Sequence, residues 1–206
     1  MFFEIKHPLI QDKLTRMRNK ETNSTTFRDN LQELTTLLAY EATKDMKLID
    51  KEIETPITKM LGKKLENKIC LVPILRAGLG MVDPLKNLIP TATIGHIGLY
   101  RDESSLDPIE YYSKMPKSIH ESDVLVLDPM LATGHSCIKA IDIVKKYNPK
   151  SITYIGILAS PEGLKNLELK HPDVNIYIAS IDKKLNENGY IVPGLGDAGD
   201  RLFGTK

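Results

Sequence analysis

Residues 124–136 read Val-Leu-Val-Leu-Asp-Pro-Met-Leu-Ala-Thr-Gly-His-Ser, an apolar run that ends in one carboxylate and a loop of small and hydroxylated residues. The aliphatic run Val124–Leu127 is typical of a strand that is buried on both faces. Asp128 then stands at the carboxyl end of that strand, where open α/β sheets place their ligands. The stretch therefore predicts an α/β fold with a mostly parallel sheet.

The loop after Asp128 leads into a helical pattern. Ile138, Ile141 and Val144 recur every three residues, and Pro149 ends the segment. The first N–H groups of a helix lack intrahelical partners, so such a loop is a ready site for an anion. Neither a Walker loop nor a dinucleotide fingerprint is present. We therefore expect a sugar-phosphate or nucleotide site, the alternative being an ordinary strand–loop–helix joint.

Composition describes an ordinary globular protein. Of 206 residues, 41% are hydrophobic and 27% are charged, and the formal net charge is +1. This balance gives no reason to expect nucleic acid or an acidic membrane surface as a partner. Neither a secretory segment nor a membrane span is predicted. Cys70 and Cys137 lack metal-ligand spacing and are expected to be reduced thiols in the cytoplasm; for Cys137, filling space is favoured over a lowered pKa at the helix start.

The rest of the chain alternates between strand and helix patterns. A long amphipathic helix is expected from Thr25 and Thr26, two candidate N-caps, after which the polar stretch 44–53 has no assigned structure. We expect no linker, and hence one domain over residues 1–206 with helices on both faces of the sheet. Strands are predicted at Ile69–Ile74, Thr93–Gly98, Val124–Leu127, Ile152–Leu158 and Val174–Ala179, and helices over Met81–Leu88 and Pro161–Lys170, the latter capped by Ser160.

Between Tyr100 and Ile119 the alternation breaks. This segment is polar, contains two prolines and is too long for a routine connection. We expect either a flexible flap over the site or a hairpin arm that contacts another subunit, while a solvated insertion without a role stays open.

A second informative segment is Val72-Pro-Ile-Leu-Arg-Ala-Gly-Leu-Gly-Met81. Arg76 follows an apolar strand directly, and Gly78 and Gly80 let the backbone approach a ligand closely. A guanidinium group at this point offers a planar fork to pyrophosphate oxygens. On this segment alone, a surface charge is an equally good interpretation of Arg76.

The third segment is the glycine-rich tail Gly189-Tyr-Ile-Val-Pro-Gly-Leu-Gly-Asp-Ala-Gly-Asp-Arg-Leu-Phe-Gly204. Five glycines in sixteen residues argue against a helix or a packed strand, and composition alone favours a frayed end. However, Ile191, Leu195 and Leu202 are among apolar anchors that a disordered end does not need. A rigid backbone could instead read the edge of a small planar base through its N–H and C=O groups.

Together these segments resemble one family over essentially the whole chain. Asp128–Ser136 resembles the phosphoribosyl-pyrophosphate (PRPP) loop of type I phosphoribosyltransferases, in the form typical of the uracil phosphoribosyltransferases. The segment around Arg76 resembles the pyrophosphate loop of that family, and Gly-Leu-Gly-Asp-Ala-Gly-Asp resembles its uracil-binding signature. Two features depart from many relatives: His135 stands where they have glycine, and the region around Lys51–Met60 looks shorter than in bacterial relatives. We favour a His135 side chain that points to solvent.

The resemblance implies a Rossmann-like type I phosphoribosyltransferase fold with a small hood, to which the N-terminal segment and the C-terminal tail contribute. It implies UMP salvage from uracil, with Mg²⁺ as cofactor. It also brings the expectation of a homodimer or homotetramer in the cytoplasm and of GTP as an activator, although relatives differ in their regulation. Position by position, the resemblance implies catalytic roles for Arg76, Asp128 and Asp197. It implies that uracil is contacted by Ile191, Gly196, Asp197 and Ala198, and that Asp197 also faces a metal held mainly by PRPP oxygens and water. The residues that it implies for PRPP binding are Arg76, Arg101, Asp128, Pro129, Met130, Leu131, Ala132, Thr133, Gly134, His135, Ser136 and Asp197.

Three other functions are compatible with parts of this pattern. They are a regulator on the same fold that binds RNA or DNA, a phosphoribosyltransferase for another base, and a plain nucleotide-binding module. The absence of a basic stripe argues against the regulator. A panel of bases offered with the ribosyl donor separates the remaining two from the uracil enzyme.

Overall fold

The computed structural model describes residues 1–101 and 108–205, with the side chain of Arg101 excepted. Its centre is a nine-stranded sheet in the order β1-β11-β10-β8-β4-β6-β7, with β5 beside β4 and β9 beside β10. All pairings in this sheet are parallel apart from β6 with β7. The predicted α/β class and mostly parallel sheet are confirmed. The strands of this sheet are β1 (Phe2–Glu4), β4 (Lys68–Leu75), β5 (Thr93–Ile94), β6 (His96–Arg101), β7 (Pro108–Lys114), β8 (Ser122–Leu127), β9 (Met130–Leu131), β10 (Ser151–Ala159) and β11 (Asn175–Ile181).

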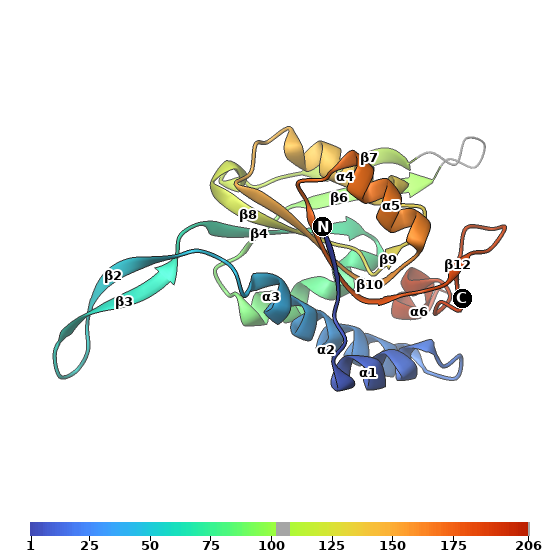
Figure 1. Ribbon diagram of the computed structural model, residues 1–206, viewed down its shortest axis with the longest axis horizontal. Coiled ribbons are helices and arrows are strands. Elements are labelled where there is room, and N and C mark those ends of the chain that lie inside the picture. The colour runs from blue at the N-terminus through green and yellow to red at the C-terminus, as the bar shows by residue number, and fades with distance from the viewer. Residues whose placement is uncertain (102–107, 206) are drawn as a thin grey trace.

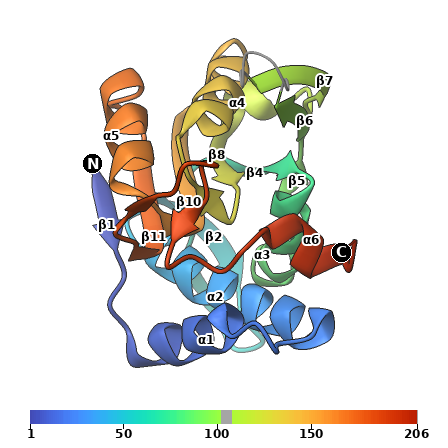
Figure 2. The ribbon, with the colours of Figure 1, turned by 90° about the vertical axis from the view of Figure 1, so that its right-hand side faces the viewer.

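Helices cover both faces of the sheet (Figure 1, Figure 2). One layer contains α4 and α5, and the other contains α1, α2 and α3. The predicted cap of α5 is confirmed, because the Ser160 hydroxyl accepts from the Gly163 N–H at 2.9 Å. The described helical segments are α1 (Pro8–Arg18), α2 (Ser24–Thr43), η1 (Ala77–Met81), α3 (Val82–Leu88), η2 (Ile119–Glu121), α4 (His135–Lys145), α5 (Pro161–Lys170) and α6 (Ala198–Phe203).

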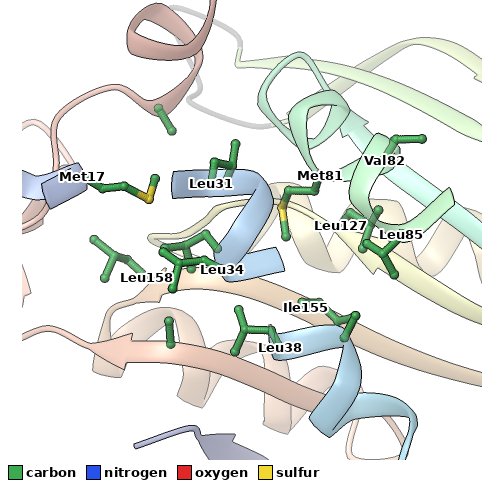
Figure 3. Close-up of a cluster of buried hydrophobic side chains, with 14 of the residues drawn as sticks. Met17, Leu31, Leu34, Leu38, Met81, Val82, Leu85, Leu127, Ile155 and Leu158 are labelled. Carbon is green, nitrogen blue, oxygen red and sulfur yellow. The ribbon is translucent and has the colours of Figure 1, made fainter. Parts of the chain in front are cut away.

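The central strands are buried because each supplies both layers of the core. Along β8, Leu125 and Leu127 face the α1–α3 layer, while Val124 and Val126 face the α4–α5 layer. This alternation follows from the period of two in a strand, and it explains why the run is apolar throughout. Figure 3 shows Leu127 with side chains from several other elements in the first of these layers. Each fully buried aliphatic side chain of this kind contributes about 1.5–3 kcal/mol.

The break predicted between Tyr100 and Ile119 contains an antiparallel pair. Strands β6 and β7 pair from His96↔Lys114 to Arg101↔Pro108 at one edge of the sheet. Of the two expected forms, the described residues therefore take the hairpin. The tip at residues 102–107 lies outside the described residues, and the contact with another subunit stays a prediction.

A second hairpin projects from the body of the molecule (Figure 1). It consists of β2 (Leu48–Glu54) and β3 (Lys59–Leu65), in register from Leu48↔Leu65 to Glu54↔Lys59. The sequence did not predict it, because its strands are exposed on both faces and carry no alternation of apolar and polar residues. The structure also corrects the start of the long helix: Asn23, two residues before Thr25, is the N-cap, and its side chain accepts from the Thr26 N–H at 2.8 Å.

The C-terminal tail is ordered, in contrast to the frayed end that composition alone favours. Leu195 and Leu202 are buried in the α1–α3 layer, as the apolar anchors predicted. The expectation that its glycines exclude regular structure is wrong, because Ala198–Phe203 forms α6. Glycine serves here at the end of the helix, where Gly204 has a φ of +64°. The tail also contributes β13 (Ile191–Val192), which pairs with β12 (Lys184–Leu185) in a separate two-stranded sheet.

Candidate functional site

Two strands end side by side at the predicted ligand edge. Pro73 of β4 lies opposite Leu127 of β8 in the parallel register, so Arg76 and Asp128 follow neighbouring strand ends. The joint after β4 is tight: a Cβ on Gly78 would lie 2.2 Å from the Leu127 carbonyl oxygen. Glycine at this position therefore allows the segment after Arg76 to pack on the end of β8. The peptide bond between Leu75 and Arg76 is cis.

The carboxyl group of Asp128 is set into the protein at this edge. Its Oδ1 accepts from the Met130 N–H at 3.4 Å, and the Tyr154 hydroxyl donates to the Asp128 main-chain oxygen at 2.8 Å. Although part of the residue is exposed, protein atoms crowd the carboxyl group. Burial raises the pKa of Asp128 to about 7, against the smaller opposing effect of the Met130 N–H. The group can therefore change its charge near neutral pH.

The loop after Asp128 is held from outside by α5. The Ser160 hydroxyl donates to the Ala132 carbonyl at 2.5 Å, and the Asn166 side-chain amide donates to the Thr133 carbonyl at 3.0 Å. A Cβ on Gly163 would lie 2.4 Å from the Ala132 oxygen, so α5 packs directly on the loop. These contacts use carbonyl groups of the loop and take none of its N–H groups.

The start of α4 offers those N–H groups to a ligand. Gly134 is the N-cap with a φ of +87°, a backbone conformation that suits glycine, and it makes no side-chain capping bond. In the described part of the chain, no backbone or side-chain acceptor takes the N–H groups of residues 133–137. A row of unpartnered N–H groups at a helix start is a site for a phosphate.

The two cysteines are both buried and unpaired with one another. Burial raises the pKa of the Cys137 thiol well above its ordinary value, and it raises that of Cys70 as well. A lowered pKa at the start of α4 is therefore wrong for Cys137, and the favoured space-filling role fits its position in the core.

His135 lies at the first position of α4 and is exposed. It lines a surface cavity of about 490 Å³ together with residues of α4 and α5 such as Ile138 and Asn166. Its side chain is therefore on the outer side of the loop, in agreement with the favoured orientation.

A separate cavity joins the loop after Asp128 to the glycine-rich tail. It measures about 290 Å³, and Met130 and Ala132 form one wall. The tail forms the other wall, which brings together the four residues expected to hold a base: Ile191, Gly196, Asp197 and Ala198. Three further lining residues, Asn188, Gly189 and Tyr190, were not predicted as site residues. Their place in a glycine-containing turn was the available signal.

Arg76 reaches the same tail from the opposite side. Its Nη2 lies 3.2 Å from Oδ1 of Asp200 in α6, and the guanidinium is more than half exposed. Asp200 was not predicted as a site residue, although it ends the Gly-Leu-Gly-Asp-Ala-Gly-Asp string. Arg101 closes β6, and its side chain lies outside the described residues. Arg76, Asp128 and the tail thus surround one edge of the sheet.

Asp197 has a structural task in addition to its place at the cavity. Its Oδ1 accepts from the Asp200 N–H at 2.8 Å and caps α6. Among the described residues, no group of three His, Cys, Asp or Glu side chains could hold a metal ion. One rim carboxylate suits a hard cation such as Mg²⁺ that takes most of its ligands from phosphate oxygens and water. The donor set therefore fits the expected cofactor.

In the described part of the chain, no helix combines the length and the apolar character needed to cross a membrane.

The chain is similar to known proteins over almost its whole length. It matches the family model described as "Uracil phosphoribosyltransferase" over residues 4–205. It is 67% identical over 203 residues to a uracil phosphoribosyltransferase of Ureaplasma parvum, with 98% of each chain covered. A solved structure of a protein from Aquifex aeolicus is 41% identical, with 98% of each chain covered and a TM-score of 0.94. A hypoxanthine-guanine phosphoribosyltransferase of Bacillus anthracis shares the fold at a TM-score of 0.52 and 15% identity, over 77% of this chain and 80% of the other. This chain belongs to the uracil phosphoribosyltransferase family.

Proposed function

We propose that this chain forms UMP and diphosphate from uracil and PRPP, with the base in the cavity between Met130 and the glycine-rich tail. One observation carries the proposal: the loop expected to hold the ribose phosphate and the tail expected to hold the base line a single cavity. The reaction salvages a pyrimidine base, and the enzyme is a pentosyltransferase.

The donor would lie along the strand ends. The N–H groups of Thr133, Gly134, His135 and Ser136 would bind the 5-phosphate, with Pro129–Ala132 shaping the cradle. Asp128 would accept from the ribose hydroxyls. Arg76 and Arg101 would face the pyrophosphate, where a guanidinium fork matches paired oxygens. Asp197 would stand near a Mg²⁺ ion held mainly by donor oxygens and water, and such an ion would supply positive charge to the leaving group.

Uracil would be read by backbone groups of the tail. Ile191, Gly196 and Ala198 line the cavity, and their N–H and C=O groups would match the donors and acceptors on the edge of uracil. A base with another edge would leave buried groups unpaired, and this penalty provides discrimination. N1 of uracil then attacks the anomeric carbon as the bond to diphosphate breaks. The protein contributes by alignment and by stabilising the departing charge.

The assembly and cellular setting are part of the same proposal. A homodimer or homotetramer is supported by the exposed apolar side chains of β2 and β3, such as Leu48 and Leu61, which monomers seldom gather on one arm. GTP as an activator and a cytoplasmic location complete the proposal, and two unpaired cysteines agree with that location.

The decisive assay measures pyrophosphate release from PRPP with uracil, cytosine, hypoxanthine and orotate offered separately. We expect release with uracil and at least about a hundredfold less with the others, since mismatched polar groups would be left buried. Release with another base in preference to uracil, or no release at all, would overturn the proposal. Binding of UMP without turnover would indicate a nucleotide-binding module.

A further inference from the structure

A buried ion pair joins two elements that are far apart in the sequence. Arg18 is the last residue of α1, and Asp182 directly follows β11. The guanidinium donates through Nη1 to Oδ2 at 2.7 Å and through Nη2 to Oδ1 at 2.5 Å. The Asp182 side chain is only 4% exposed, so the paired charge is essential to its burial.

Both members of this pair also hold the backbone of Gly194. The Gly194 N–H donates to Asp182 Oδ2 at 2.8 Å, and Arg18 Nη1 donates to the Gly194 carbonyl at 2.8 Å. One residue thus has its donor and its acceptor bound by a single ion pair. Gly194 cannot be replaced without strain, since its φ is +63° and a Cβ would lie 2.1 Å from the Ile191 oxygen.

Asp182 is in turn fixed to the sheet beside the loop that follows Asp128. The Asp182 N–H donates to the Ala159 carbonyl at 2.8 Å. In the parallel register, Ala159 lies opposite Leu131, and its neighbour Leu158 lies opposite Met130. Strand pairing and hydrogen bonds therefore connect the Met130 wall of the cavity, through Ala159 and Asp182, to Gly194, which lies two residues before Gly196 in the opposite wall.

We propose that Arg18 and Asp182 are positioning residues that set the base-reading backbone of the tail against the loop holding the donor. The inference rests on the proposed function. Neither side chain lines the cavity, so both would act through Gly194, two residues before Gly196. Backbone groups cannot reorient like side chains, so a small displacement of the tail removes both affinity for the base and discrimination between bases.

Asp182→Asn and Arg18→Met test this role. Asp182→Asn keeps the shape but loses the charge, and Arg18→Met keeps an apolar stem but loses every donor. Arg16→Gln is the matched control, because Arg16 lies on the same helix with a side chain 61% exposed, and among the described residues its one ion pair is with Asp12, at 2.9 Å. The readouts are KM for uracil, KM for PRPP, the uracil-to-cytosine ratio of kcat/KM, and Tm.

We expect either variant to raise KM for uracil by about tenfold and to lower the uracil-to-cytosine ratio by a similar factor. KM for PRPP should stay within about twofold, and the double variant should be no worse than the poorer single one, since the two residues form one unit. Arg16→Gln should match the parent chain.

A lower Tm with unchanged uracil KM and unchanged base preference would overturn the inference, as would an equal rise in both KM values. Arg18→Lys keeps the positive charge but loses the paired donors of the guanidinium. If Arg18→Met does not fold, the same kinetic constants are measured on Arg18→Lys, at a temperature below its Tm. An inactive parent chain would instead count against the proposed function, so the two failures are distinguishable.

Discussion

At the scale of single residues, we expect Asp128 to make the site sensitive to pH near neutrality. Its pKa of about 7 means that the folded chain holds a proton that an unfolded carboxyl would release near 3.8. The contribution of this group to stability is therefore fully present below the unfolded value and is lost as the pH rises to about 7. An ionised Asp128, the better acceptor for ribose hydroxyls, is gained over the upper part of the same range.

As the pH rises toward 7, catalytic activity should therefore increase while the free energy of unfolding decreases. We expect kcat/KM for PRPP to increase with an apparent pKa near that of Asp128, because this quantity reports on the free enzyme. Asp128→Asn should lower kcat/KM, flatten the rise and remove the loss of unfolding free energy between pH 4 and 7, with the fold intact. A parental pH profile in this variant would contradict the role of Asp128.

The close packing of Gly78 on the end of β8 leads to a second prediction. Gly78→Ala places a Cβ against the Leu127 carbonyl, a backbone atom that cannot move aside, so the segment carrying Arg76 must shift. We expect a loss of about 1–3 kcal/mol in unfolding free energy and a higher KM for PRPP. Gly62→Ala is the control, because its Cβ would meet the flexible end of Ile53 at 3.3 Å. Equal Tm values for the two variants would refute the argument.

Site residues that end a predicted strand could be predicted from the sequence. Arg76 and Asp128 follow apolar runs directly, and parallel strands bring such positions to one edge. Arg18 and Tyr190 could not be found in this way, because their roles depend on how α1 and the tail pack. Asp182 is intermediate: it directly follows the observed strand β11, but the predicted strand ended at Ala179, and nothing local revealed the partner of Asp182.

At the scale of elements, the amino-acid sequence predicts buried strands better than exposed ones. The runs that became β4, β8 and β10 are apolar because both faces are covered, so composition alone reveals them. Helix α1 has only three buried positions, Ile10, Leu14 and Met17, in a charged segment. Their spacing of four and three was the available signal. Helix α6 was not predicted because the glycines of the tail argue against a helix.

The cap of α2 provides a test at this scale. Asn23→Ala should lower the unfolding free energy by about 1 kcal/mol, because the Thr26 N–H loses its acceptor. Thr25→Ala, at a cap position expected from sequence, should change it by less than about 0.5 kcal/mol. Thermal or urea unfolding of the two variants decides between the caps, and a larger effect at Thr25 would favour the cap expected from the sequence.

At the scale of the whole molecule, the β2–β3 hairpin is separable from the core. Its ends are adjacent, since the Glu66 N–H donates to the Lys47 carbonyl at 2.9 Å. Replacing residues 48–65 with a short Gly/Ser turn should leave cooperative unfolding intact, because the hairpin packs mainly on itself (Figure 1). The proposed oligomer should weaken, so sedimentation should show smaller species. A molten or unfolded product would show that the core needs the arm.

The pairing of β1 with β11 bears on the order in which the chain can fold during synthesis. Phe2 lies opposite Ile176, Arg18 pairs with Asp182, and Arg201 donates to the Asn19 carbonyl at 2.7 Å. None of these contacts can form until the ribosome has made the residues beyond 175. The first strand must therefore wait unpaired for most of translation, whereas helix α1 can pack early on α2, the helix that follows it. A stalled chain that lacks only the tail would lose one wall of the cavity, and the Asn19 carbonyl would lack its Arg201 donor.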